Sequence, residues 1–401
     1  MKSILVIGSE GYIGHNLAAY FEAISWTVFS TGQSSSKRAN YHAADICDQN
    51  AVRRIILDLK PDVVLHVAGI SSLAHCENDP AACRAVNVDG TRHIIEAVAE
   101  VGATCKLVFF SSDYVFDGEA GNYDEESPCH PLTEYGRAKV VSEDEIRRRL
   151  DNYVILRMSN VYGRGGKFYN FVRERLEVGS PIELFNDTLF APVSIDYLLR
   201  AVKVLIEKDF RGVLHLGGPQ CLSRYDFGLL VAEHLNADPA LVSAVPQPAG
   251  GLISRNSSLC TTKSAAHVPC YNPPVAKALH IMAGLFTYPH LHYVDARGLI
   301  HGVTQLRDWE EINYSQSAAN AVRGNHYHRR TTEGFYIISG RMRVSTVSLA
   351  DGRRYWFYAE AGDSFVITPM HRHTFEIVED SSWINYLSRA MVEGEEKDIC
   401  V

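Results

Sequence analysis

Five apolar runs in the amino-terminal part constrain the fold most strongly, because they are apolar on both faces. They are "ILVIG" (4–8), "VVLHVAG" (63–69), "LVFFSS" (107–112), "YVILRMS" (153–159) and "VLHLGG" (213–218), and amphipathic segments of helical character separate them. Strands that are buried on both faces and alternate with helices are typical of a doubly wound parallel sheet. The sequence therefore predicts an α/β fold for this part of the chain.

From residue 286 onward the pattern changes to short apolar runs that Gly, Asp and Pro interrupt. Examples are residues 334–340, 343–349, 355–360 and 364–369. This spacing favours an antiparallel all-β barrel or jelly roll. A chain of 401 residues, 46% of them hydrophobic, holds enough apolar sequence for two cores. We therefore expect two domains, residues 1–283 and residues 286–401.

The charge and the cysteines restrict the class of partner and the compartment. The formal net charge is -8 and no block of basic residues occurs, so neither a nucleic acid nor a membrane surface is an expected partner. The nine cysteines form no CxxC pair and their number is odd, which indicates reduced thiols and a cytoplasmic protein. No stretch approaches the roughly 18 apolar residues that a membrane-spanning helix needs.

The sequence "GSEGYIG" follows the first apolar run and opens a helix-like segment. In such a turn, Gly8 permits the tight bend, Gly11 lets the backbone approach a pyrophosphate, and Gly14 allows close packing of helix on strand. Tyr12 and Ile13 lie within the same turn and are included in the predicted site. The motif predicts dinucleotide binding, and a glycine-rich turn without a ligand is the alternative.

The second predicted strand bears on the form of the dinucleotide. It ends in "VFSTGQSSSKR", which lacks the acidic residue that commonly binds a free ribose 2′-hydroxyl. Lys37 or Arg38 could instead receive a 2′-phosphate, which favours NADP(H) over NAD(H). The alternative is a basic pair that is merely solvated.

The sequence "EYGRAK" places Tyr135 and Lys139 four residues apart, downstream of "FFSSDYVFDG". Residues i and i+4 share a helix face, so an ammonium beside the phenol would lower a pKa of about 10 and make Tyr135 a proton donor near neutral pH. Ser112, at the end of a predicted strand, could bind a carbonyl oxygen that is being reduced. A YxxxK pair alone is commonly an exposed helix face, but the glycine motif and "SSDYVF" upstream favour a catalytic group.

Together these motifs resemble the extended short-chain dehydrogenases/reductases, and most closely the dTDP-4-dehydrorhamnose reductase family. The resemblance covers roughly residues 1–283 and includes "GSEGYIG", "PDVVLHVAG", "NVDGT", "SSDYVFDG", "EYGRAK", "LRMSNVYG", "APVSIDYLLRAV", "LSRYDF" and "RNSSL". It implies a Rossmann-type sheet, and a sugar-binding part formed mainly by residues 160–275. Ser112, Tyr135 and Lys139 would form the catalytic group. Tyr135 would protonate the C4 oxygen of a nucleotide-linked 4-keto sugar as hydride arrives, and Lys139 would also hold the nicotinamide ribose.

The resemblance also implies positions around the cofactor and the sugar. The residues expected near the cofactor are Asp45 and Ile46, close to the adenine, and Ala68 and Gly69, close to its central portion. Asp113 would face the sugar. At Asn160 the family commonly has a tryptophan, so the sugar pocket is expected to differ in shape there.

Four residues of the carboxyl-terminal part combine metal-ligand chemistry with suitable spacing. His326 and His328 lie at i and i+2, so on a strand they point to the same face. Glu333 follows shortly after, and His373 lies in "PMHRHTFE". Three nitrogens and one carboxylate suit zinc or another divalent first-row metal. A closed structural metal site is one alternative; ordinary surface or core histidines are another, and that interpretation is preferred for His371.

This part resembles the cupin superfamily, whose two motifs match "GNHYHRRTTEGFYIISG" and "GDSFVITPMHRH". The segment "VRGNHYH" is also similar to nucleotide-sugar 3,5-epimerases, in which a histidine of an RGxH motif acts beside a 4-keto group; His326 takes that position. The order of reductase and cupin is similar to bifunctional enzymes of capsular-polysaccharide synthesis. The resemblance implies that the cupin epimerises, at C3, a nucleotide-linked 4-keto-6-deoxyhexose, which the first domain then reduces at C4 with NADPH.

One ketone would serve both reactions, because it acidifies the neighbouring C–H groups and is itself the hydride acceptor. A metal or Arg323 near the ketone oxygen would stabilise the enolate. Three other interpretations stay open: a cupin that acts as a 3,4-ketoisomerase, a cupin that only stabilises a dimer, and a first domain that is a nucleotide-sensing regulatory subunit. By analogy with such proteins, a homodimer is expected.

Overall fold

The computed structural model describes residues 2–36, 38–283, 291–295, 298–303, 309–390 and 398–400. The chain divides into two compact units. The first comprises Met1–Ala232 with Asp238–Val268, and the second Glu233–Ala237 with Pro269–Val401. In this division residues 269–283 fall in the second unit.

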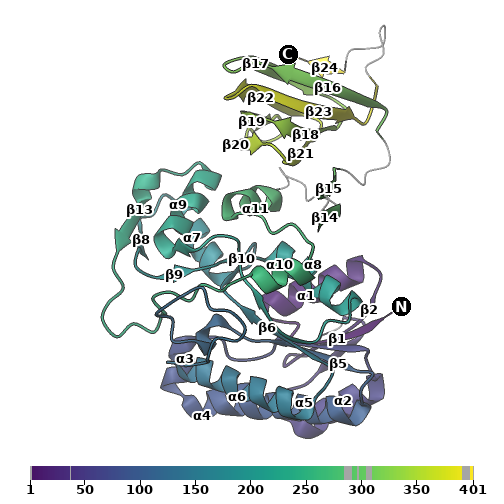
Figure 1. The fold of residues 1–401 in the computed structure, drawn as a ribbon, viewed down its shortest axis with the longest axis vertical. Coiled ribbons are helices and arrows are strands. Elements are labelled where there is room, and N and C mark those ends of the chain that lie inside the picture. Colours follow the sequence, from purple (N-terminus) through teal and green to yellow (C-terminus); the bar gives the residue numbers. More distant parts are fainter. Residues whose placement is uncertain are drawn as a thin grey trace. The chain divides into compact units, whose positions relative to one another are not determined.

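A seven-stranded parallel sheet forms the centre of the first unit (Figure 1). Its order is β11-β6-β5-β4-β1-β2-β3, with the bounds β1 Ser3–Ile7, β2 Thr27–Gly32, β3 Tyr41–Ala43, β4 Val63–His66, β5 Lys106–Phe110, β6 Tyr153–Met158 and β11 Gly212–Leu216. All neighbouring strands run parallel. The five predicted apolar runs contain β1, β4, β5, β6 and β11, so the predicted doubly wound α/β fold is confirmed. The strand order reverses between β1 and β4, and folds of this kind bind ligands beyond the carboxyl ends of the strands at such a point.

Helices cover both faces of this sheet. Figure 1 shows α2 (Gln49–Leu59), α5 (Gly90–Val101) and α6 (Glu134–Arg149) along one face, and α1 (Tyr12–Ala23) and α8 (Ile195–Glu207) on the other. Asp48, Thr133 and Ser194 cap α2, α6 and α8, because each side chain accepts a hydrogen bond from a backbone N–H of the first turn. One continuous core joins strands and helices, and its fully buried members include Leu5, Val64, Leu107, Ile56, Ile94 and Ile146.

Shorter elements complete this part of the chain. They are α3 (Leu73–Asn78), α4 (Pro80–Arg84), a π-helical turn (Ala85–Asp89), a 3-10 turn (Asp113–Val115), β7 (Val161–Tyr162), α7 (Lys167–Glu177), β8 (Ile182–Phe185), β9 (Leu189–Phe190), β10 (Val193–Ser194), β12 (Leu222–Ser223), α9 (Arg224–Leu235), a second 3-10 turn (Pro239–Leu241), β13 (Val242–Val245) and α10 (Thr262–His267). The short strands pair as β7 with β10, β9 with β12, and β8 with β13. Most of these elements follow β6 and fall in the range that the sequence assigned to sugar binding.

Two antiparallel sheets form the second unit. One has the order β16 (Glu311–Ser317), β23 (Ser381–Leu387), β18 (Glu333–Ser339), β21 (Ser364–Ile367); the other has the order β20 (Arg354–Glu360), β19 (Arg341–Ser348), β22 (His371–Ile377), β17 (Val322–His328), β24 (Ile399–Cys400). Helix α11 (Val275–Met282) and a hairpin of β14 (Leu291–Asp295) and β15 (Gly298–Gly302) precede them. Alternate residues of both sheets share one core, including Phe335, Ile337, Val344, Phe357 and Phe365. The predicted antiparallel all-β region is confirmed.

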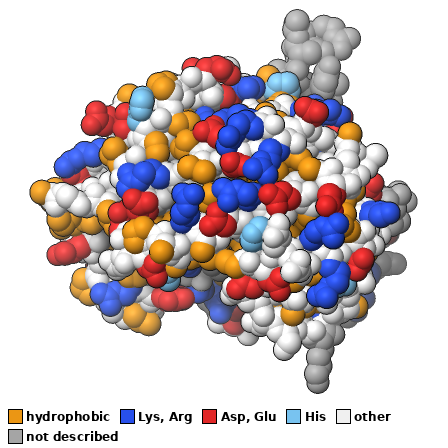
Figure 2. Space-filling view, turned by 90° about the horizontal axis from the view of Figure 1, so that it is seen from below, with side chains coloured by type: hydrophobic (Ala, Val, Ile, Leu, Met, Phe, Trp, Pro, Cys, Tyr) orange, Lys and Arg blue, Asp and Glu red, His pale blue; other side chains and the backbone are white. Residues whose placement is uncertain are grey.

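Charged side chains of both signs interleave on the face of the molecule seen from below (Figure 2). Ion pairs link neighbouring helices of the first unit: Arg53 of α2 pairs with Glu100 of α5 (2.8 Å), and Arg149 of α6 pairs with Glu96 of α5 (3.1 Å). These pairs balance charge locally along the helices. Within the part of the chain that the structure describes, no helix has both the length and the apolar character needed to cross a membrane.

Candidate functional site

The glycine-rich turn between β1 and α1 leaves little room for side chains. Gly8 has a φ of 95°, and a Cβ atom there would lie 2.7 Å from the Ala68 backbone. A Cβ atom on Gly14 would lie 2.2 Å from the Gly8 carbonyl oxygen, so α1 contacts the end of β1 directly. At Gly11 the corresponding distance to the same oxygen is 3.5 Å, an ordinary contact. The turn therefore offers the bare backbone surface that a pyrophosphate group fits.

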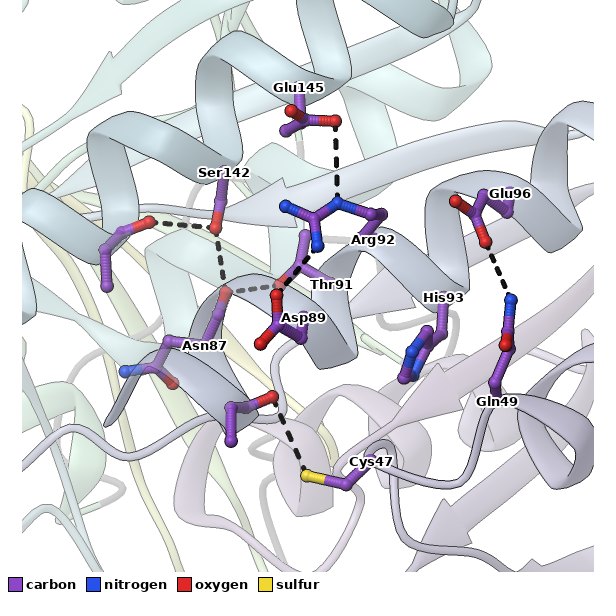
Figure 3. Close-up of polar contacts among 12 residues, drawn as sticks. Cys47, Gln49, Asn87, Asp89, Thr91, Arg92, His93, Glu96, Ser142 and Glu145 are labelled. Atoms are coloured by element: carbon purple, nitrogen blue, oxygen red, sulfur yellow. Dashed lines mark hydrogen bonds and ion pairs between the residues drawn. The ribbon is translucent and has the colours of Figure 1, made fainter. Parts of the chain in front are cut away.

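Asn87 holds the loop that follows β4. The Ile70 backbone N–H donates to Asn87 Oδ1 (2.8 Å), and Asn87 Nδ2 donates to the Ile70 carbonyl (2.9 Å). Asn87 lies in the π-helical turn, where its own carbonyl accepts hydrogen bonds from Thr91 Oγ1 (2.7 Å) and from Ser142 Oγ of α6 (2.8 Å) (Figure 3). The residue thus ties the predicted cofactor loop to the helix that carries Tyr135. Asn87 stands in "NVDGT", but no sequence pattern marks it as a site residue.

Ser112, Tyr135 and Lys139 lie together beyond the carboxyl end of β5. Ser112 follows that strand and is hydrogen-bonded to Tyr135, in the first turn of α6. Lys139, one turn further along α6, is buried. Its Nζ atom donates to the Phe110 carbonyl (2.8 Å) and lies 5.8 Å from the centre of the Tyr135 ring. The structure therefore brings together the three residues that the sequence grouped.

The expected lowering of the Tyr135 pKa by Lys139 is wrong for this structure, and burial is the reason. Burial raises the pKa of Tyr135 above its usual value; the hydrogen bond with Ser112 opposes this, and the nearby Asp113 carboxylate adds to it. The phenol therefore keeps its proton at neutral pH. It can still donate that proton, but as a weaker acid than the i, i+4 spacing suggested.

A buried ion pair joins α6 to β6. Arg157 of β6 and Glu143 of α6 have side chains that are 2% and 0% exposed, and their charged atoms are 2.8 Å apart. Glu143 Oε1 also accepts a hydrogen bond from Ser111 Oγ (2.6 Å), directly before Ser112. Burial lowers the pKa of Lys139 to about 8, and the negative charge of Glu143 opposes this shift. Glu143 therefore links α6 to β6 and to the end of β5, and its charge helps to keep Lys139 protonated.

Asp113 meets protein partners where a sugar contact was expected. It is 4% exposed; Ser112 Oγ donates to Oδ1 (3.0 Å) and Ser257 Oγ donates to Oδ2 (2.8 Å). Burial raises the pKa of Asp113, while the hydrogen bonds from Ser257 and Ser112 act in the opposite direction. Asp113 therefore positions Ser112. Asn160, the other predicted sugar residue, is half-buried, and its carbonyl accepts from the Val193 N–H (3.0 Å).

The other predicted cofactor residues lie at the carboxyl edge of the sheet. Asp45 follows β3 and is exposed; its Oδ2 accepts a hydrogen bond from Gln33 Nε2 (3.2 Å). Ile46 is 6% exposed and packs into the core. The remaining members follow β4 or begin α1; Gly69 is exposed, and the half-buried ones are Ala68, Tyr12 and Ile13.

Of the two basic residues expected to receive a 2′-phosphate, the structure describes only one. Arg38 forms an ion pair with Glu22 of α1, which partly neutralises its charge. Lys37 lies outside the described residues. The geometry of the glycine turn therefore fits a dinucleotide, whereas the described basic residue already has an acidic partner.

His326, Glu333 and His373 converge inside the second unit. One possible ligand atom from each lies within 4.8 Å of the others. His373 Nε2 is 3.0 Å from Glu333 Oε2, and His328 Nε2 is 3.3 Å from the same oxygen. His328 also turns Nδ1 toward Asp398 Oδ2 (3.4 Å). The four predicted ligands are thus neighbours, and three of them form a compact set.

A β-bulge brings His326 to this place. The register between β17 and β22 shifts between Gly324 and His326, so that His326 lies opposite His373. The extra residue, Asn325, has a φ of 59°. Arg323, on the same strand, is exposed and donates from Nε to Ser317 Oγ (2.8 Å). The sequence pattern gave no sign of the bulge.

The donor atoms of this cluster fit a divalent cation. His373 Nε2 and Glu333 Oε2 are buried, and neither meets the geometry of a hydrogen bond within the described residues. Burial alone would raise the pKa of Glu333, but its contacts with His328 and His373 lower it to about 2, so the carboxylate is ionised. Burial lowers the pKa of His326, which favours the neutral ring that a metal binds. Imidazole nitrogens with one carboxylate are typical zinc ligands.

A cavity of about 330 Å³ in the second unit has Thr346 and Ile367 in its lining, but none of the four predicted ligands. Thr346 lies opposite His373 on neighbouring strands, and Ile367 lies opposite Glu333. Residues that face each other across antiparallel strands lie side by side on one face of the sheet. The cavity therefore begins next to the histidines and the glutamate.

Comparisons with known proteins match both parts of the chain. Residues 1–283 match the RmlD substrate binding domain, and residues 293–389 match the polysaccharide biosynthesis C-terminal domain. Methionine adenosyltransferase 2 subunit beta of Bos taurus is 26% identical over 253 residues, which cover 59% of this chain and 72% of that protein. The probable low-salt glycan biosynthesis reductase Agl14 of Haloferax volcanii is 27% identical over 301 residues, which cover 70% of this chain and 97% of that protein. Among solved structures, dTDP-4-dehydrorhamnose reductase from Bacillus anthracis in complex with NADP has the same fold, with a TM-score of 0.63, 21% identity, and coverage of 70% of this chain and 97% of that one.

Proposed function

Because the chain belongs to the family of the RmlD substrate binding domain, we propose that its first unit reduces nucleotide-linked 4-keto-6-deoxy sugars for surface-polysaccharide synthesis. The observation that carries this proposal is the grouping of Ser112, Tyr135 and Lys139 at the carboxyl end of β5. This strand is next to β4, where the strand order of the sheet reverses toward β1. A nicotinamide dinucleotide supplies the hydride, as the NADP in the Bacillus anthracis complex suggests.

Each residue of this group has a separate task in the proposed reduction. Ser112 Oγ turns its proton from Asp113 Oδ1 to the ketone oxygen when the substrate binds. Tyr135 gives its proton to that oxygen as C4 receives hydride, so the ketone becomes an alcohol. The positive charge of Lys139 stabilises the phenolate that is left, and its ammonium also holds the nicotinamide ribose. Asp113 holds Ser112 in place before the substrate binds, because it accepts the proton of the Ser112 hydroxyl.

Replacing the phenol tests the reduction. With Tyr135→Phe we expect the rate of dinucleotide oxidation by a nucleotide-linked 4-keto sugar, followed by absorbance, to fall by roughly 10²–10⁴-fold, because general acid catalysis is lost. The affinity for the dinucleotide should change little. Tyr153→Phe is the matched control, since it removes a phenolic hydroxyl from the amino end of β6, whereas the site lies at the carboxyl ends of the strands. Full activity of Tyr135→Phe would refute the assignment.

For the second unit we propose a metal-dependent cupin that epimerises the same substrate at C3 before reduction. His326, Glu333 and His373 would hold a divalent ion, zinc being the best match, which polarises the ketone when bound. The RGxH resemblance also made His326 a candidate base, but one ring nitrogen cannot bind a cation and accept a proton at once. Its place in the compact set favours the ligand role. Strand neighbours of His373 and Glu333 line a cavity, and this favours a catalytic site over a closed structural one.

The order of the two reactions follows from the ketone. Reduction removes the group that acidifies the C3 hydrogen, so inversion has to come first and becomes permanent afterwards. Arg323 uses only its Nε–H in the hydrogen bond with Ser317, so its terminal N–H groups could stabilise negative charge on the substrate.

Proton exchange in deuterated water tests the proposed epimerase. Without dinucleotide, the C3 proton signal of a nucleotide-linked 4-keto-6-deoxy sugar should disappear with the wild type and persist with Glu333→Gln. Glu376→Gln, on the exposed side of β22, is the control. A ketone that moves to C3 would instead indicate a 3,4-ketoisomerase. No exchange with the metal-loaded wild type would leave the second unit a structural or dimerising module.

A regulatory subunit is the second candidate for the first unit, because one relative is a subunit of methionine adenosyltransferase. Such a subunit would bind a dinucleotide without consuming it in the presence of any 4-keto sugar. The assay of Tyr135 therefore separates the two candidates.

A further inference from the structure

An acidic side chain lies at the end of β2, although the strand itself ends in Gly32. A Cβ atom added to Gly32 would lie 2.4 Å from the carboxyl carbon of Glu10. Glu10 belongs to the glycine-rich turn, between Gly8 and Gly11. The carboxyl group therefore fills the space that a side chain of the last β2 residue would occupy.

Three hydrogen bonds hold this carboxyl group in place. Glu10 Oε2 accepts from the Gln33 N–H (3.0 Å), and Oε1 accepts from the Ser34 N–H (3.1 Å) and the Tyr41 hydroxyl (3.0 Å). Burial acts to raise the pKa of Glu10, but these hydrogen bonds dominate and lower it. The group is thus a fixed negative charge at neutral pH.

From this geometry we infer that Glu10 is the residue that discriminates between the two forms of the nicotinamide dinucleotide. In dinucleotide-binding folds, an acid near the end of the second strand accepts a hydrogen bond from the free ribose 2′-hydroxyl of NAD(H). A carboxylate in the same place repels the 2′-phosphate of NADP(H), which is itself doubly charged. The inference rests on the proposed dinucleotide-dependent reductase.

The described surroundings of Glu10 do not offset this repulsion. Residues 33–45 contain only two basic residues, Lys37 and Arg38. Arg38 pairs with Glu22 of α1, and Lys37 lies outside the described residues. The preference for NADP(H) that the sequence favoured is therefore reduced by an acid that comes from the glycine turn, which a search along the second strand does not reveal.

The test measures binding without a sugar substrate. Isothermal titration calorimetry would compare NADH with NADPH, and ADP-ribose with 2′-phospho-ADP-ribose, for the wild type and for Glu10→Gln. We expect the variant to favour the 2′-phosphorylated member of each pair by roughly tenfold more than the wild type does, because one like charge is removed. Glu100→Gln, which removes an acid of α5 paired with Arg53, should leave both ratios unchanged.

Glu10→Asp separates charge from shape, because it keeps the carboxylate and should keep the wild-type ratios. Unchanged ratios in Glu10→Gln, or an equal loss of affinity for both members of each pair, would show that Glu10 only ties the glycine turn to β2 and would overturn the inference. The proposed function fails separately: a protein that binds dinucleotides with the expected ratios but reduces no 4-keto sugar would retain the role of Glu10 and lose the reductase assignment.

Discussion

Burial makes the ammonium group of Lys139 easier to deprotonate than that of an exposed lysine. Burial lowers its pKa to about 8, and the unfolded chain would have a value of about 10.4. As the pH rises through 8 the folded, cofactor-free protein loses the ammonium, so kcat/KM for reduction should fall above that pH. Tyr135 does not produce this limb, because burial raises its pKa.

A pH profile of kcat/KM checks this prediction, since the profile reports groups of the free enzyme. A profile that stays flat to about pH 10 would contradict it. The sign for stability is the opposite: between about pH 8 and 10.4 the unfolded chain binds the extra proton, so the contribution of Lys139 to the free energy of unfolding rises with pH.

At the same scale, the sequence identified residues whose chemistry is local and missed those that act across the fold. Ser112, Tyr135 and Lys139 were found because a short spacing and a motif order specify them. Glu10 and Asn87 were not, because their partners, Ser34 and Ile70, lie many residues away and meet them only in the folded chain. The direction of the Tyr135 pKa failed for a related reason, since spacing on a helix does not report burial.

At the scale of one element, two glycines of the turn between β1 and α1 are expected to have different roles, one in packing and one in ligand binding. Gly14→Ala should lower the free energy of unfolding by about 1–3 kcal/mol or more, because its Cβ atom would lie 2.2 Å from the Gly8 carbonyl oxygen. Gly11→Ala should unfold close to the wild type, since its Cβ atom makes an ordinary contact, yet bind dinucleotides more weakly because a methyl group would meet the pyrophosphate.

Denaturant unfolding and calorimetric titration of both variants distinguish the two effects. Equal stability of Gly14→Ala and the wild type would show that α1 can move away from β1. Unchanged dinucleotide affinity of Gly11→Ala would place the pyrophosphate elsewhere.

The elements themselves differed in how far the sequence predicted them. Buried parallel strands such as β4 and β5 are long apolar runs, and periodicity alone reveals them. The bulge at Gly324 to His326 is a property of the pairing between β17 and β22, so the sequence of neither strand alone predicts it. That pairing, more than the i, i+2 rule, decides that His326 faces His373.

At the scale of the whole molecule, two units with separate cores should respond separately to their ligands. Removing a bound divalent ion with a chelator should lower the unfolding temperature of the second unit by on the order of 5 °C or more, because the ion binds only the folded cluster. NADH or NADPH should raise the unfolding temperature of the first unit only. Differential scanning calorimetry can follow both transitions.

Glu333→Gln is the control for the chelator. Because this variant lacks a metal ligand, its second unit should unfold at the lowered temperature without chelator, and the chelator should not lower that temperature further. Metal analysis that finds no bound ion in the wild type, together with transitions that the chelator leaves unchanged, would remove the metal site from the account. The fold of each unit was predictable from the sequence, whereas the epimerase activity of the second unit and its coupling to the first through one ketone stay predictions.

Transfer of a label from the dinucleotide to the sugar tests the central claim most directly. NADH and NADPH deuterated at C4 of the nicotinamide, on either face, would be incubated with a nucleotide-linked 4-keto-6-deoxy sugar, and the product would be examined by NMR. We predict deuterium at C4 of the sugar with the wild type, and slow or undetectable transfer with Tyr135→Phe. Binding of the dinucleotide without transfer of deuterium to any 4-keto sugar would contradict the account and identify the first unit as a binding subunit.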